Sequence, residues 1–235
     1  MRKIFLALLS FAFFSAGAQT VEEVIQKYAA NLGGLDAFNK IKTAKMTGTV
    51  TAQGNELTIT VQVINGRAVR TDVEVMGNQI VNAYKDGKGW KINPFGGATT
   101  ATDATDAELT EMKIQTMLAP VLMDYKSRGH QVELQGQEDV NSIKTFKVKL
   151  TSKDDAKVTT YYISAADYSL VKSVSDREMM GQTMAVESWY SDPKEINGMK
   201  FYMSRTQMID GQEFQSVKFD KVELDVQIDE KVFDK

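Results

Sequence analysis

The sequence predicts a mainly β protein of the α+β class, built on a single, strongly curled antiparallel sheet. Three observations support this fold class. About a dozen segments alternate apolar and polar residues with a period of two, as strands with one buried face do. Turn residues such as Asn-Gly and Asp-Gly separate these segments at near-regular spacing, and helical periodicity is confined to two regions. The 235 residues, 43% of them hydrophobic, suffice for one large domain, which we expect to span residues 19–235.

The first 18 residues have the three parts of a secretory signal peptide. Arg2 and Lys3 form a basic start, residues 4–14 form an apolar core, and residues 16–18 supply the small-x-small cleavage pattern. The apolar core is too short to span a bilayer comfortably. We therefore expect residues 1–18 to be a signal peptide and the mature chain to start near Gln19.

The composition excludes several kinds of chemistry. The absence of Cys removes disulfides, thiol nucleophiles and Cys-ligated metals, and the single His, His130, removes His triads and multi-His metal sites. Without Arg2 and Lys3 the 28 basic residues fall to 26 against 31 acidic ones, a net charge of −5. No basic stripe remains that would indicate a nucleic-acid partner. We expect no cofactor, no metal and no membrane-spanning segment.

The exported, disulfide-free chain also indicates a compartment. Small extracellular domains usually need disulfides, but a mature chain of this length has a large enough core without them. This combination suits a bacterial envelope protein, located in the periplasm or exported further.

The element order begins with a helix. Thr20 and Glu23 form a capping box, apolar residues then recur on one helical face as far as Leu32, and Gly33-Gly34 ends the helix. Residues 35–41 are predicted to form a second short helical turn.

Strands follow from residue 44, where the period changes to two. Apolar residues occupy one face of residues 44–52, and the same pattern resumes at residues 57–63 after a turn at Gln53-Gly54-Asn55. Asn65-Gly66 is a strong hairpin signal. The next strand runs from residue 69 to 75, and two further short strands include Tyr84, Trp90 and Ile92.

A second helical region is predicted over residues 106–126. Thr105 and Glu108 form a capping box, and apolar residues continue to Tyr125. Pro120 should break or kink this helix into two pieces, because it lacks an N–H and clashes with the preceding turn.

After Gly129 the strand pattern returns and persists to the end of the chain. The predicted strands are 131–135, 145–151, 157–163, 170–177, 183–190, 201–208 and 212–224. Asp154-Asp155, Asn197-Gly198 and Asp210-Gly211 fall between them as turns.

Isolated polar residues give weak catalytic signals. His130, at a helix-to-strand junction, has no visible partner group, and a surface loop position is the simpler interpretation. Asp103, Asp106 and Glu108 fit the acidic first turn of a helix better than a cation site. Asp86-Gly87-Lys88-Gly89 is too short for a phosphate loop. We therefore expect no enzyme activity.

Soft apolar side chains give a more informative signal. The chain has 12 Met, several at strand positions close to aromatic residues. Methionine adapts to irregular apolar partners, so these residues fit either ordinary core or the lining of a cavity for a fatty chain. Composition alone leaves both interpretations open.

One segment carries a resemblance to a known family. Residues 86–95, Asp-Gly-Lys-Gly-Trp-Lys-Ile-Asn-Pro-Phe, resemble a strand of the periplasmic lipoprotein carriers, the LolA-like family. The order of elements is similar across the mature chain, with an amphipathic N-terminal helix, a Thr/Ala-rich stretch at residues 98–104 before the middle helix, and a closing strand followed by Glu230 and Phe233.

The resemblance implies a half-open antiparallel barrel, covered by lid helices that close over an apolar cavity for lipoprotein acyl chains. Family members carry an arginine in that cavity within a Lys-Arg-Pro context. The corresponding segment here is Asn65-Gly66-Arg67, with no Arg-Pro, and the resemblance does not choose between Arg67 and Arg70 as the equivalent.

The expected function is binding and transfer of lipid acyl chains, of a lipoprotein or another lipid, without catalysis. Envelope membrane proteins are the other expected partners, and Pro120 and Gly33-Gly34 would permit lid movement. A sensor or interaction module on the same fold is the main alternative, and an exported hydrolase with two unrecognised carboxylates is a third. The candidate cavity residues are Met46, Val50, Leu57, Ile59, Val61, Val73, Val75, Trp90, Met112, Met117 and Leu122.

Overall fold

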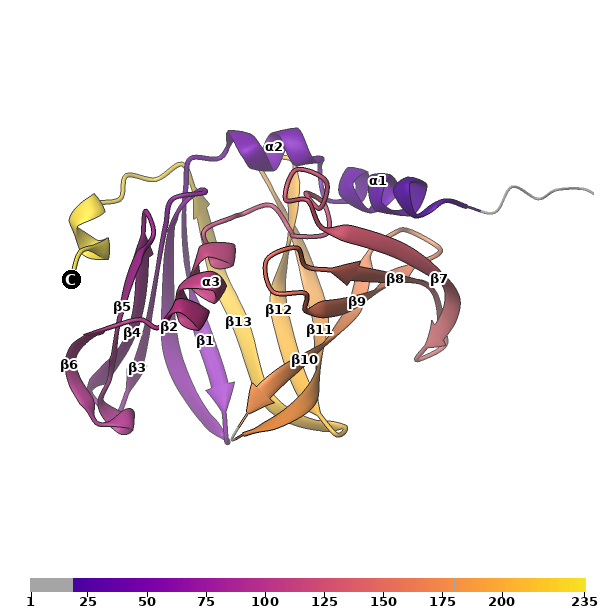
Figure 1. Ribbon diagram of the computed structural model, residues 1–235. Coiled ribbons are helices and arrows are strands. Elements are labelled where there is room, and N and C mark those ends of the chain that lie inside the picture. Colours follow the sequence, from indigo (N-terminus) through magenta and orange to yellow (C-terminus); the bar gives the residue numbers. More distant parts are fainter. Residues whose placement is uncertain (1–18, 180) are drawn as a thin grey trace, which may run out of the picture.

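The computed structural model describes residues 19–179 and 181–235, which form one antiparallel sheet of 13 strands. The strand order is β6-β5-β4-β3-β2-β1-β13-β12-β11-β10-β9-β8-β7, so β1 pairs with β13 and the two halves of the chain meet at the centre. Strands β6 and β7 are the free edges, so the sheet is curled but not closed (Figure 1). The predicted fold class is confirmed. The signal peptide predicted at residues 1–18 lies outside the described residues.

The strands differ from the predicted ones mainly in their ends. Their bounds are β1 (Thr43–Ala52), β2 (Asn55–Ile64), β3 (Ala68–Val75), β4 (Asn78–Lys85), β5 (Lys88–Asn93), β6 (Ala98–Asp103), β7 (Gln131–Val140), β8 (Ile143–Thr151), β9 (Val158–Ser164), β10 (Leu170–Met179), β11 (Gln182–Ile196), β12 (Met199–Ile209) and β13 (Gln212–Leu224).

The first helices start where their caps predict. In α1 (Val21–Asn31), the Thr20 hydroxyl accepts from the Glu23 N–H and the Glu23 carboxylate accepts from the Thr20 N–H. α2 (Leu35–Lys40) follows directly and is the predicted short turn. Between them, a Cβ on Gly33 would lie 2.5 Å from the carbonyl oxygen of Gly198, so only glycine allows this approach to the β11–β12 turn.

The main core lies between these helices and one half of the sheet. Buried residues of α1 and α2, such as Tyr28 and Phe38, pack with the segment 119–125 and with β8, β9 and β10. Figure 1 shows α1 and α2 along one end of the strands. The resemblance predicted helices that cover the sheet, and α1 and α2 pack against it at this end.

The predicted middle helix is shorter than expected. α3 runs from Asp106 to Gln115 with the predicted capping box, but residues 117–129 form turns instead of a second helix. Pro120 cannot donate a helical hydrogen bond, and the following N–H groups of Met123 and Asp124 bond only three residues back. The prediction of helix over 106–126 is therefore wrong beyond residue 115.

The two short 3-10 helices complete the described chain. η1 (Pro94–Gly96) connects β5 to β6, the strand that the Thr/Ala-rich stretch forms and that the sequence pattern did not predict. η2 (Glu230–Phe233) follows β13 and folds back against β3 and β4.

Candidate functional site

The concave face of the sheet has an apolar half formed by β13, β1, β2 and β3. Gly48 lies in register with Ile59, and Ile59 with Val73, so the three share one face. Val50 and Val217 face each other on the same side. These side chains form a cluster whose outer members are only half-buried: Ala52, Val61, Val73 and Phe219.

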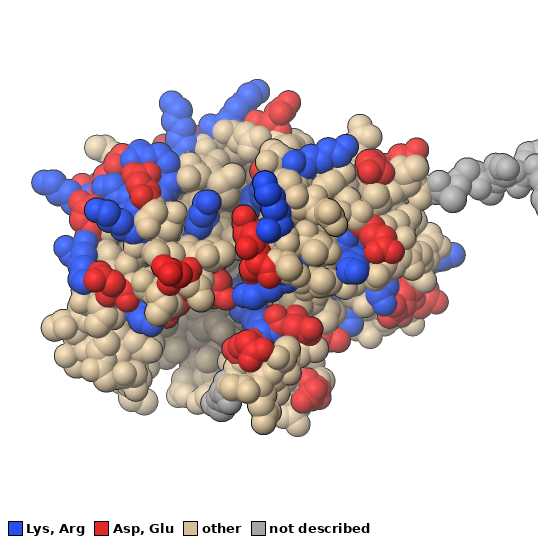
Figure 2. Space-filling view, in the orientation of Figure 1, with Lys and Arg blue, Asp and Glu red and all other residues tan. Residues whose placement is uncertain are grey.

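α3 covers the adjoining part of this face. Met112 is 6% exposed and packs against Val63, Val69 and Tyr84. A Cβ on Gly89 would lie 2.8 Å from Leu109 Cδ2, so the absence of a side chain there allows α3 to lie close to β5. Figure 2 shows the surface hollowed below α3, between β3–β6 and the β10–β11 hairpin. We call this hollow, with the cluster above, the groove.

A polar row crosses the other half of the groove. Ser173, Ser188 and Gln207 lie in register on β10, β11 and β12, and each is less than 9% exposed. The Gln207 amide donates to the Ser188 hydroxyl at 3.5 Å, and the Ser173 hydroxyl lies 3.2 Å from that of Tyr190. The two walls therefore differ in polarity, one aliphatic and one rich in hydroxyl and amide groups.

Arg205 is a basic residue of this face. It lies in register with Val217 on one side and Tyr190 on the other, and its side chain is exposed. Sequence reasoning did not select Arg205 or the polar row. A signal was present in the sequence, because Ser173 and Ser175 of β10 are two residues apart and therefore share a face. They place small polar side chains where a core strand would carry aliphatic ones.

The predicted cavity residues lie in several different parts of the molecule. Val50, Ile59, Val61 and Val73 form or border the aliphatic cluster of the groove. The half-buried side chains of Leu57 and Val75 continue the same face towards the strand ends, because Leu57 pairs with Val50 and Val75 follows Val73 by two residues.

Three further predicted residues lie beneath α3, in the main core or beside the β2–β3 turn. Met46 packs, half-buried, against the cluster beneath Met112. Leu122 is 0% exposed and belongs to the core under α1. Met117 lies beside the β2–β3 turn, with its sulfur 3.6 Å from a Cβ built on Gly66.

Trp90 lies on the opposite face of the sheet. It is in register with Ala83, and Ala83 with Arg70, whereas the groove face of β4 carries Tyr84. The Trp90 indole N–H donates to the backbone oxygen of Phe233 at 2.8 Å. The sheet register thus separates Trp90 from the other strand residues of the predicted lining.

Neither arginine considered as the family's cavity residue points into the groove. Arg70 pairs with Asp72 at 2.7 Å, donates to the Val232 carbonyl and lies over the Trp90 ring on the opposite face. Arg67 pairs with Asp86 and Glu230 at the surface. Both side chains hold the C-terminal segment or a turn in place.

The polar residues that gave weak catalytic signals have local partners. His130 Nδ1 accepts from the Lys153 backbone N–H at 3.1 Å. Glu108 caps α3 and pairs with Lys91, whose hydrogen bond is the largest of the effects that lower the pKa of that carboxyl. Burial raises the pKa of Tyr28 and of Tyr161, so both phenols stay neutral. Within residues 19–179 and 181–235, no three His, Asp or Glu side chains gather as a metal site.

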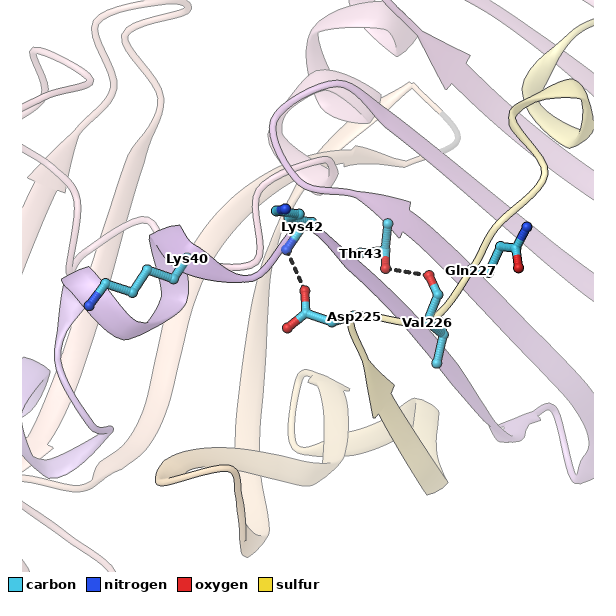
Figure 3. Close-up of a pocket in the computed structure, with 6 residues that line it drawn as sticks. All are labelled: Lys40, Lys42, Thr43, Asp225, Val226 and Gln227. Carbon is cyan, nitrogen blue, oxygen red and sulfur yellow. Dashed lines mark hydrogen bonds between the residues drawn. The ribbon is translucent and has the colours of Figure 1, made fainter.

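A pocket of about 490 Å³ lies outside the groove, where the end of α2 meets the end of β13 (Figure 3). Its polar contacts join the two chain segments: the Lys42 N–H donates to Asp225 at 2.8 Å, and the Thr43 hydroxyl donates to the Val226 carbonyl at 2.6 Å. The Lys40 side chain points away from Asp225 (Figure 3). These contacts fix the end of β13 against β1.

Comparisons with known proteins identify the fold through structure alone. No family model matches the sequence, and neither does any curated protein. A LolA superfamily protein from Nitrosomonas europaea has a TM-score of 0.60 at 12% identity, over 93% of this chain and 99% of that one. An outer membrane lipoprotein-sorting protein domain from Vibrio parahaemolyticus has a TM-score of 0.59 at 10% identity, over 90% and 95%.

A third solved structure agrees. A DUF1329 family protein from Desulfovibrio piger has a TM-score of 0.58 at 10% identity, over 92% of this chain and 98% of that one. At these identities the likeness concerns the arrangement of the chain and not its ligand. No helix in the described parts of the chain is long and apolar enough to cross a membrane. The protein therefore has a LolA-like fold, in which an open, curled sheet partly covered by helices presents a concave face.

Proposed function

We propose that this protein binds the acyl chains of a lipoprotein or another lipid in the groove and transfers them by binding and release, without covalent catalysis. The observation that carries the proposal is the aliphatic cluster around Ile59, whose outer members Val61 and Val73 are only half-buried on the groove side. A soluble domain normally buries such a cluster, and each methylene that a ligand placed there would contribute about 0.8 kcal/mol before ordering costs.

The polar row extends the proposal to amphipathic ligands. An acyl chain on the wall of Val61 and Val73 leaves the polar part of the molecule near Ser188 and Gln207, whose hydroxyl and amide groups can exchange hydrogen bonds with an ester or a carboxylate. Small-molecule sites commonly combine an apolar lining with a few placed polar groups.

Native mass spectrometry of protein purified from its host without detergent tests the proposal directly. We expect bound lipid, and we expect the lipid-free protein to take up a fluorescent fatty acid. Val73→Asn should weaken that uptake about tenfold, because it removes aliphatic surface and adds an amide to the apolar wall. Thr58→Asn changes an exposed residue on the opposite face of β2 and is the matched control. Absence of bound lipid together with absence of uptake contradicts the proposal.

The cover is part of the proposed cycle, because a carrier has to release its cargo. α3 buries only Met112, and the turn segment with Pro120 follows it, so we expect α3 to move more readily than α1. Hydrogen exchange measured with and without a fatty acid should show the largest change at the amides of α3. Equal protection in both states would contradict the movable cover.

We further propose that residues 1–18 are removed on export and that residues 19–235 act as a single domain in the bacterial periplasm. N-terminal sequencing of protein from the periplasmic fraction should begin near Gln19. Gene deletion separates a carrier from a sensor on the same fold, since loss of a carrier mislocalises lipoproteins whereas loss of a sensor alters only a stress response.

A further inference from the structure

The two ends of the strands β1–β6 differ in polarity. At the end next to α2, the turns carry Asn65 and Asp86. At the other end, which we call the open end, the turns are Gln53-Gly54, Met76-Gly77 and residues 94–97 (Figure 1). The groove opens towards this same end (Figure 2).

Met76 stands at a turn position that its own conformation does not favour. Its φ is 50°, in the left-handed region, and its side chain is 85% exposed. The equivalent residue before glycine in other turns of this chain is polar, as at Asp86, Asn197 and Asp210, with φ between 48° and 51°. Asn and Asp tolerate this region better than an unbranched apolar residue. Neither the turn nor the core explains a methionine there.

Phe95 is presented in a similar way. It lies in η1 with 58% of its surface exposed, and the Asn93 side chain accepts from the Gly96 N–H to fix this turn. Gly97, with φ 84°, ends it. The loop is therefore an ordered structure that holds a phenylalanine towards solvent.

The open end also lacks charge. No Asp, Glu, Lys or Arg occurs in residues 50–55, 75–84 or 93–102. Figure 2 shows the corresponding lower-left surface free of acidic and basic side chains, in contrast to the upper part of the molecule. Exposed acidic residues mark the limit of this region: Glu56 and Glu74 on the adjoining strands, and Asp210 and Glu213 beside the half-exposed Phe214.

We propose that the open end docks on a lipid bilayer, with Met76 and Phe95 inserted into its interfacial layer. The apolar residues stand on separate hairpins instead of forming one flat patch with a polar rim, which is what a protein partner would require. Uncharged tips carrying an aromatic residue suit the bilayer interface. In this orientation the groove opens towards the lipid. The inference itself rests on the exposed turns that carry Met76 and Phe95, and not on the proposed ligand.

Because the open end carries no Lys or Arg, attraction to anionic lipids does not drive this docking. We therefore expect the protein to bind vesicles of pure phosphatidylcholine, with little change when the salt concentration rises. The double variant Met76→Asn/Phe95→Ser should bind at least tenfold more weakly. Ile143→Asn removes another exposed apolar residue, 43% exposed, from the start of β8 and should leave binding unchanged.

The absence of Cys allows a site-specific probe. A polarity-sensitive fluorophore attached through Met76→Cys should shift to shorter wavelength on addition of phosphatidylcholine vesicles, whereas the same probe at Ile143→Cys should not. Thermal melts establish that all variants fold, and Met76→Asn should be at least as stable as the parent. Fatty-acid uptake in solution should persist in the double variant, which separates this inference from the proposed function.

Any one of four results would overturn the inference. The first is no binding to phosphatidylcholine vesicles, the second is equal binding by the double variant, and the third is an unshifted probe at position 76. Binding of the open end to a membrane protein, without binding to lipid vesicles, would also overturn it.

Discussion

Arg205 of β12 lies in register with Val217 of β13, so a guanidinium group and a buried aliphatic side chain share the concave face at adjacent positions. The boundary between the polar and the apolar walls of the groove passes between these two residues. A ligand that spans the boundary would place its hydrocarbon on the side of Val217 and its polar end on the side of Arg205. This geometry leads to a prediction about ligand class.

We predict that Arg205→Met weakens binding of a fatty acid three- to tenfold but leaves binding of the fatty alcohol of equal chain length unchanged. The carboxylate loses an ionic hydrogen bond, whereas the alcohol never made one. The loss stays near 1 kcal/mol because the arginine is exposed and its charge is screened. Competition for a fluorescent fatty acid measures both affinities.

Lys218→Met is the control for this comparison. Lys218 follows Val217 in β13 and therefore points to the opposite face, where its charge is exposed. Both ligands should bind this variant as they bind the parent. An equal loss for acid and alcohol in Arg205→Met would show that the arginine acts through packing and not through charge.

A second prediction concerns the C-terminal segment. Phe233 is 2% exposed, and its carbonyl accepts from the Trp90 indole. Phe233→Ala should lower the free energy of unfolding by about 3–5 kcal/mol, because it opens a cavity on the convex face. Urea denaturation followed by tryptophan fluorescence measures the change.

Phe95→Ala provides the contrast, since this side chain is 58% exposed and its loss should change stability by about 0.5 kcal/mol or less. Similar costs for the two variants would mean that η2 does not pack on Trp90 in solution.

Elements with local determinants could be predicted from the sequence, and elements with distant ones could not. The capping boxes at Thr20 and Thr105 and the Asn65-Gly66 hairpin depend on neighbouring residues, and all three are present. The alternation of side chains along each strand likewise selected Ile59 and Val73, which share one face of the sheet.

The face of Trp90 had no local signal, because it depends on η2, which returns from a point 143 residues later in the chain. The polar row depends on the relative register of β10, β11 and β12, which no single strand pattern contains. For the same reason Arg205 could not be assigned to the groove before the strands were paired.

A third prediction compares two neighbouring glycines. Gly33 and Gly34 both have positive φ, 105° and 90°, but only at Gly33 would a Cβ meet backbone, 2.5 Å from the Gly198 oxygen. Gly33→Ala should therefore cost about 1–3 kcal/mol more than Gly34→Ala, which adds only the strain of the left-handed conformation. Thermal melts of the two variants measure the difference, and equal melting temperatures would show that the α1–α2 junction is not packed on the β11–β12 turn.

The last prediction concerns acid pH and α3. Hydrogen bonds from Lys91 and from the Thr105 N–H hold the pKa of Glu108 below its ordinary value of 4.5. A carboxyl with a lowered pKa in the folded state adds stability above the pKa of the unfolded state, and that contribution disappears as the pH falls through the folded-state pKa. Glu108→Gln should therefore cost about 0.5–1 kcal/mol at neutral pH, through the lost ion pair and helix-dipole interaction.

The difference between parent and variant should shrink as the pH falls below 4.5, because protonation neutralises Glu108 in the parent as well. Urea midpoints followed by circular dichroism from neutral pH to pH 3 measure it. Glu111→Gln is the control, since Glu111 lies on the same helix and makes only an exposed pair with Lys157 at 3.6 Å, so its loss should have little effect at any pH. A constant difference between parent and Glu108→Gln across this range would mean that the carboxylate charge does not stabilise the start of α3.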